Sequence, residues 1–152
     1  MSILNFSEQQ YFTDLRSDSQ EVNLGSFNQS KTMKLGNVRL FLYLKGSFTN
    51  ETITLHVKDD PDAPVFDATA TVSVGDVPDV TTDWLGWVRF DFDKEFIVDG
   101  AEYYLTAETA NYTESATKYM GVAFDYPNFQ QESDHGVGYI NYCSKFQLYG
   151  LE

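Results

Sequence analysis

Residues Gly86–Glu108 read GWVRFDFDKEFIVDGAEYYLTAE, and this stretch decides the fold. Apolar and polar residues alternate on both sides of Asp99-Gly100, a dipeptide that is typical of tight turns. Alternation with a period of two predicts strands that are buried on one face. The face of the first strand that we expect to line a core carries Val88, Phe90 and Phe92.

The same alternation continues outward along the chain in both directions. It defines one apolar face made of Val38, Leu40, Leu42 and Leu44, and a second made of Ile53, Leu55 and Val57. GSFTNE lies between these two strands and predicts a hairpin-like connection. The strands predicted in this way span residues 23–33, 37–46, 51–60, 65–75, 86–93, 101–108, 118–126 and 138–150.

No segment keeps the helical period of 3.6 residues over three turns, and the first twenty residues are predicted as a short helix or an extended arm. About eight strands without crossover helices predict an all-β fold, an antiparallel β-sandwich of the jelly-roll type. We expect one domain. Residues 1–36 form an N-terminal arm plus the first strand of that domain, and residues 37–152 form the jelly-roll β-sandwich.

Composition sets limits on the class of protein. The chain has 152 residues, of which 42% are hydrophobic and 16% aromatic, and this is typical of one folded domain. Its single cysteine, Cys143, predicts that no internal disulfide forms. The net charge is −13, and residues 1–46 hold five basic and four acidic groups, so the acidic excess lies in the remainder. An acidic body repels phosphate and argues against nucleic acid as a partner.

The N-terminal residues MSILNFSEQQYF lack a basic segment followed by an apolar one, so no signal peptide is predicted. No apolar run approaches the roughly 20 residues of a membrane span. We therefore expect synthesis in a host cytoplasm without export and without insertion into a membrane.

Three segments, NVRLFLYLKGSFTNETITLHVKDD, the Gly86–Glu108 stretch and the closing FQLYG, resemble in their order the jelly-roll modules of bacteriophage virion proteins and of carbohydrate-binding modules. The residues that carry the resemblance are Trp87, Phe90, Phe92, Gly100, Tyr104 and Leu105. The resemblance covers roughly residues 35–110 and the last strand. It implies the fold, and it implies a role in a virion or in sugar binding, although such a fold hosts many functions.

Candidate ligand-binding residues are Trp84, Trp87 and Tyr104, because exposed aromatic rings form platforms for sugars and for protein partners. Trp84 and Trp87 flank Leu85-Gly86 where a loop enters a strand. One of the two indoles is expected in the core. Trp87 is the better surface candidate, since it lies on the face opposite Val88.

Asp59, Asp60 and Asp62 lie within four residues in DDPDAP, and closely spaced oxygen ligands suit Ca²⁺. A structural calcium ion here is one hypothesis, and a solvated loop without any cofactor is the other. No nucleophile elbow, phosphate-binding loop or HExxH motif is present in the sequence, so we expect no enzymatic activity.

Together these observations favour a non-enzymatic structural protein of a bacteriophage virion, either a capsid decoration or a tail component. Its expected partners are other virion proteins or further copies of itself, and contact with a host surface is compatible with this role. The alternative is a carbohydrate-binding module that uses Trp and Tyr platforms to bind a glycan.

Overall fold

The computed structural model describes residues 11–15, 21–28, 33–60, 62, 67–77, 83–92, 97–98, 102–125, 143–144 and 146–151. The strands in this part of the chain are β1 (Tyr11–Asp14), β2 (Val22–Asn28), β3 (Met33–Lys45), β4 (Thr52–Lys58), β5 (Asp67–Ser73), β6 (Asp83–Asp91), β7 (Ile97–Val98), β8 (Glu102–Ala110), β9 (Tyr119–Asp125), β10 (Cys143–Ser144) and β11 (Phe146–Leu151). One 3-10 turn, η1 (Val74–Asp76), follows β5. The expected all-β class is confirmed. The Asp99-Gly100 turn and the first ten residues lie outside the described residues.

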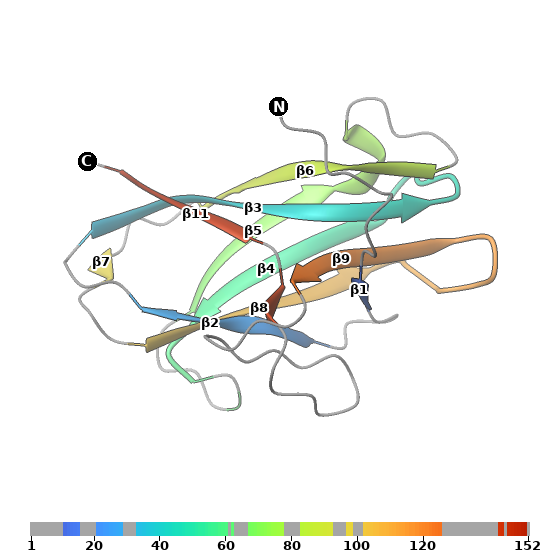
Figure 1. Cartoon of the computed structure of the whole chain (residues 1–152). Helices are drawn as coiled ribbons and strands as arrows, with labels where there is room; N and C mark the ends of the chain where they lie inside the picture. Colours follow the sequence, from blue (N-terminus) through green and yellow to red (C-terminus); the bar gives the residue numbers. More distant parts are fainter. Residues whose placement is uncertain are drawn as a thin grey trace.

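The strands form two antiparallel sheets that lie in separate layers (Figure 1). Sheet B has the order β2-β8-β4-β5. In sheet A, β3 pairs with β6 along one edge from Asn37 to Lys45. Its other edge pairs with β9 near Lys45 and with β11 from Lys34 to Leu40, and β9 pairs in turn with β1.

The connectivity is that of a jelly roll. Successive long strands alternate between the sheets except for β4 and β5, which pair with each other in sheet B, and this gives β1-β9-β3-β6 in sheet A and β2-β8-β4-β5 in sheet B. The two halves of the Gly86–Glu108 stretch therefore belong to different sheets, because β6 pairs with β3 while β8 pairs with β4 and β2. For the same reason the predicted hairpin-like connection between β3 and β4 is wrong. Their connection crosses from one sheet to the other.

The core lies between the sheets and contains the apolar faces that the alternation predicted. Val38, Leu40, Leu42 and Leu44 of β3 are buried, as are Ile53, Leu55 and Val57 of β4, Val88 and Phe90 of β6, and Tyr103, Leu105 and Ala107 of β8. Phe92 is partly buried against this cluster. The prediction of which face points inward is confirmed for β3, β4 and β6.

The loops at one end of the sandwich are held by a buried ion pair. The Glu51 side chain is 2% exposed and pairs with the Nζ atom of Lys118, while its other carboxylate oxygen accepts a hydrogen bond from the backbone N–H of Thr49 at 2.7 Å. Burial raises the pKa of Glu51, but the bonds from Lys118 and Thr49 outweigh it, so the pKa lies below its ordinary value. The carboxylate thus ties the β3–β4 connection to the β8–β9 connection.

Gly46 begins the β3–β4 connection with a φ of 100°, a conformation that favours glycine. A Cβ atom at this position would lie 2.6 Å from the carbonyl oxygen of Thr117 in the β8–β9 connection. The two connections can therefore approach each other only because residue 46 has no side chain.

Candidate functional site

The free edges of the two sheets meet along one side of the sandwich. In the described part of the chain, β6 pairs only with β3, and β5 pairs only with β4. An edge strand leaves the N–H and C=O groups of alternate residues without a partner strand. β5 and β6 also contact each other across the two layers. β6 thus lies at an edge that no other described strand covers.

A groove of about 630 Å³ follows this edge. One wall consists of six consecutive residues of β6, Trp84 to Arg89. The opposite wall is formed by the end of β5 and by η1 with the residue after it, namely Val72, Ser73, Asp76 and Val77. The groove has the size of a typical ligand site, and its lining combines apolar side chains with a few polar groups.

Trp84 points inward and is partly buried against the core. Its indole lies across Gly86, since a Cβ atom added to Gly86 would come 2.6 Å from the Cζ2 atom of Trp84. Glycine at position 86 therefore sets where the ring lies and shapes the wall of the groove.

This arrangement leads to a first prediction. Gly86→Ala is expected to displace the Trp84 ring while preserving the sandwich, because the clashing atoms are at the far end of a side chain and not in the backbone. The intrinsic tryptophan fluorescence spectrum should shift, and the far-ultraviolet circular dichroism should not. Trp84→Phe removes the reporting indole, so the fluorescence spectra of Trp84→Phe and of the double variant Trp84→Phe/Gly86→Ala should be the same. An unchanged fluorescence spectrum in Gly86→Ala would contradict the placement of the ring.

Trp87 points outward from the same strand and is half-buried. It lies directly opposite Phe41 of β3, and the two rings meet edge to face with centroids 5.4 Å apart and an interplanar angle of 82°. Such a pair contributes about 0.5–1.5 kcal/mol beyond its buried area. Phe41 itself is only 4% exposed. The contact with Phe41 thus fixes the orientation of the Trp87 ring, which lines the groove.

A charged side chain completes this side of the groove. Arg89 is exposed, and its Nε atom donates to the Oδ1 atom of Asp91 at 2.7 Å. Surface pairs of this kind contribute little to stability. The guanidinium is therefore available to a ligand at small cost, as is the exposed carboxylate of Asp76 on the opposite wall.

The structure brings together two of the three predicted ligand-binding residues. Trp84 and Trp87 line the same groove, one from each face of β6. Tyr104 lies on β8, a central strand of sheet B, opposite Lys58 of β4. It does not line the groove, and a single ligand there would not contact all three rings.

The predicted calcium ligands lie in the loop that follows β4. Asp60 and Asp62 are exposed, and the Oδ1 atom of Asp60 accepts a hydrogen bond from the backbone N–H of Asp62 at 2.8 Å. This local turn accounts for one carboxylate oxygen. A calcium ion held by these residues and Asp59 stays a prediction.

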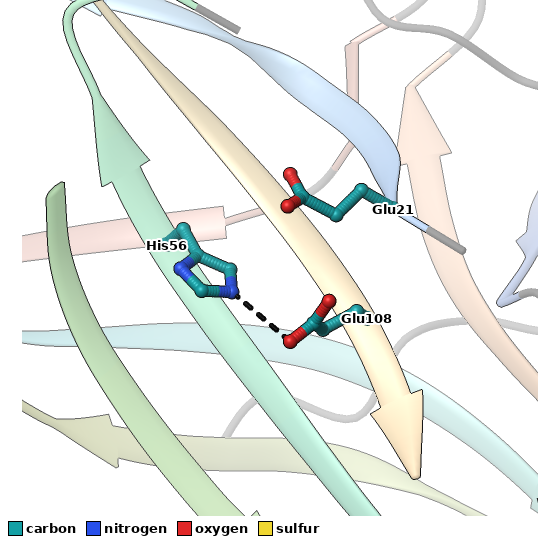
Figure 2. Close-up of side chains that lie close together, drawn as sticks. All are labelled: Glu21, His56 and Glu108. Atoms are coloured by element: carbon teal, nitrogen blue, oxygen red, sulfur yellow. Dashed lines mark ion pairs between the residues drawn. The ribbon is translucent and has the colours of Figure 1, made fainter. Parts of the chain in front are cut away.

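A second cluster of polar side chains covers the outer face of sheet B and was not predicted from the sequence. It is centred on His56 of β4, with Glu108 on β8 and Glu21 immediately before β2 (Figure 2). One potential ligand atom from each of these three side chains lies within 4.8 Å of the other two. His56 lies on the face opposite the predicted apolar face of its strand, but the sequence does not reveal the strand register that brings it together with Glu108.

Glu21 is held in this cluster by two donors. Its carboxylate oxygens lie 2.8 and 2.6 Å from the Nζ atom of Lys58, and the Oγ1 atom of Thr106 donates to it at 2.9 Å. Partial burial raises the pKa of Glu21, but the hydrogen bonds from Lys58 and Thr106 have the larger combined effect and lower it below its ordinary value. The side chain is thus an ionised acceptor near neutral pH.

No protein-family model, curated protein or solved structure matches the chain. Among the described residues there is also no helix with the length and apolar character needed to cross a membrane. The groove and the polar cluster are therefore the two features from which a function can be inferred.

Proposed function

We propose that this chain is a structural protein of a bacteriophage virion, a jelly-roll module of the capsid surface or the tail that binds a neighbouring virion protein. The observation that carries this proposal is the groove along the free edge of β6, because a groove lined by six consecutive residues of a strand suits an extended segment of another protein. The resemblance of the sequence to virion jelly rolls supports the same class.

The chemistry of the groove supports binding of a peptide strand. Backbone groups of β6 that pair with no described strand can form a ladder with an added strand over roughly 20 Å, at about 3.3 Å per residue. Trp84 and Trp87 supply apolar contacts on the two faces of that ladder. Arg89 and Asp76 provide one charge of each sign, which can select the direction of the bound segment.

The experiment is a binding measurement between the purified chain and the proteins of the purified phage particle. Trp87→Ala is expected to weaken the complex by at least about thirtyfold, as truncation of a central interface aromatic does. Tyr104→Ala removes an aromatic ring from the other sheet and should leave the affinity unchanged. Equal effects of the two variants, or no binding to any virion protein, would contradict the proposal.

A glycan ligand is the second candidate, and it is favoured by one observation, the two indoles that line a single groove. Stacking of a sugar ring on Trp87 would use the same surface. A glycan array separates the two functions. A specific signal that Trp87→Ala abolishes identifies a carbohydrate-binding module, whereas a silent array together with a virion-protein complex identifies the structural role.

A further inference from the structure

The imidazole of His56 lies between two carboxylates on the outer face of sheet B. Its Nδ1 atom is 3.0 Å from the Oδ1 atom of Asp67 on β5, and its Nε2 atom is 3.3 Å from the Oε1 atom of Glu108 on β8. A carboxylate only accepts hydrogen bonds, so the proton of the Asp67 contact is on Nδ1. In the neutral ring this leaves a lone pair on Nε2, directed toward Glu108 (Figure 2).

That Nε2 atom is buried and makes no hydrogen bond with any described residue, although the side chain as a whole is 12% exposed. A buried ring nitrogen whose neighbour is a carboxylate oxygen requires either a second proton or a cation between the two atoms. A histidine that donates its other N–H to a carboxylate is the arrangement found around protein-bound metals, where the carboxylate fixes the tautomer and the ring orientation.

Glu21 supplies a third ligand to the same position. Together with His56 and Glu108 it forms a set of one nitrogen and two oxygens within 4.8 Å of one another. Metal bonds of about 2.0–2.2 Å place ligand atoms no more than about 4 Å apart, so small side-chain rotations close the set. One imidazole with two carboxylates is suited to Zn²⁺ and related first-row cations and not to Ca²⁺, which takes oxygen ligands.

The charge balance is also favourable to a cation. Three carboxylates, those of Glu21, Asp67 and Glu108, surround one imidazole and one ammonium group, that of Lys58. Lys58 binds Glu21 and therefore competes with any metal for its oxygens. The position left for a second positive charge is beside Glu108 and His56, where the Oε1 atom of Glu108 faces a ring nitrogen that makes no hydrogen bond with any described residue.

We propose that His56, Glu108 and Glu21 bind one divalent transition-metal cation, of which Zn²⁺ is the representative, with Asp67 orienting the imidazole. Water completes the coordination. The bound cation links β4, β8 and the residue that precedes β2, so it stabilises sheet B. This site is separate from the groove, which lies at the β5–β6 edge, and does not depend on the function proposed for it.

The test is calorimetric titration of the chelator-treated full chain with ZnCl₂, which should give one ion per chain and a higher melting temperature. His56→Gln should weaken binding by about 100-fold or more, and Asp67→Asn by about tenfold, the lower end of effects seen for residues that orient a ligand. His135→Ala is the matched control, because it removes the other of the two histidines and should change nothing. Lys58→Met should tighten Zn²⁺ binding, because it releases the Glu21 carboxylate. A variant that fails to fold would not bind Zn²⁺ more tightly.

A measurement on the wild-type chain avoids dependence on variants that fail to fold. With only two histidines, the proton NMR signals of the His56 ring can be followed during addition of Zn²⁺, and they should shift while those of His135 do not. Absence of Zn²⁺ binding, binding that survives His56→Gln, or binding lost in His135→Ala would each overturn the proposal and leave His56 as a bridge between Asp67 and Glu108.

Discussion

Phe90→Ala is expected to lower the free energy of unfolding by about 3–5 kcal/mol, the usual cost of removing a buried phenylalanine ring. Phe90 is 0% exposed and lies near the end of β6, opposite Val38 of β3, where both side chains enter the core. Domains of this size are stable by only about 5–15 kcal/mol, so the variant should unfold at a much lower urea concentration. Equilibrium urea denaturation followed by circular dichroism measures the change.

Trp87→Ala is the matched control, because the two aromatic residues belong to the same strand but to opposite faces. Trp87 loses its edge-to-face contact with Phe41 and part of its buried area, and we expect a loss of about 1–2 kcal/mol. If Trp87→Ala were the more destabilising of the two, the assignment of inward and outward faces in β6 would be incorrect.

Glu51→Gln is expected to cost about 2–3 kcal/mol of stability at neutral pH. Breaking a fully buried ion pair costs about 3–5 kcal/mol, and the loss is smaller here because Lys118 is one-third exposed and can turn toward water. The variant also weakens the acceptor of the Thr49 N–H. Thermal and urea unfolding of both proteins give the difference.

The pH dependence of this difference follows from the lowered pKa of Glu51. A carboxyl group with a lower pKa in the folded state contributes stability above its unfolded pKa, and this contribution disappears as the pH falls through the folded pKa. The difference in unfolding free energy between wild type and Glu51→Gln should therefore be complete at pH 7 and should shrink as the pH falls below the ordinary pKa of a glutamic acid and through the lowered pKa of Glu51. Glu21 titrates in the same direction in both proteins, so it cancels in the comparison. A gap that is constant down to acid pH would show that the ion pair contributes nothing.

The alternation of residues was enough to predict the inward faces of β3, β4 and β6, because a period of two fixes which side chains share a face. The alternation does not indicate which strands pair. For this reason the predicted hairpin-like connection between β3 and β4 was wrong. A tight turn and a crossing between sheets use the same polar residues. Strand pairing in a jelly roll depends on long-range contacts that local sequence does not encode.

The difference between local alternation and long-range strand pairing also explains which residues of the groove and of the polar cluster could be predicted from the sequence. Trp84 and Trp87 are three residues apart on one strand, so their presence in a single groove follows from local geometry once that strand lies at an edge. Tyr104 has the same local appearance but lies on a central strand of the other sheet. His56 and Glu108 meet only through the β4–β8 register, in which Glu108 lies opposite Thr54, and this register is set by the whole sandwich.

The outward aromatic residues of sheet A consequently have two roles. Phe41 is held against Trp87, and Tyr43 packs edge to face on Tyr119 with ring centroids 5.6 Å apart, so these rings stabilise the outer surface of the sheet. Trp87 differs from the others in that it also lines the groove. It is the residue at which packing within the fold and contact with a partner coincide.

The measurement that tests the proposed function most directly is site-specific photo-crosslinking within the assembled phage particle. A photoreactive amino acid at Leu85 or Arg89, both on the groove wall, should crosslink to another virion polypeptide, and the same group at the exposed residue Thr71 of β5 should not. Crosslinked peptides that place an extended segment beside β6 are the result we expect. Absence of the chain from purified particles, or crosslinks from Thr71 but not from the groove, would contradict the proposed function.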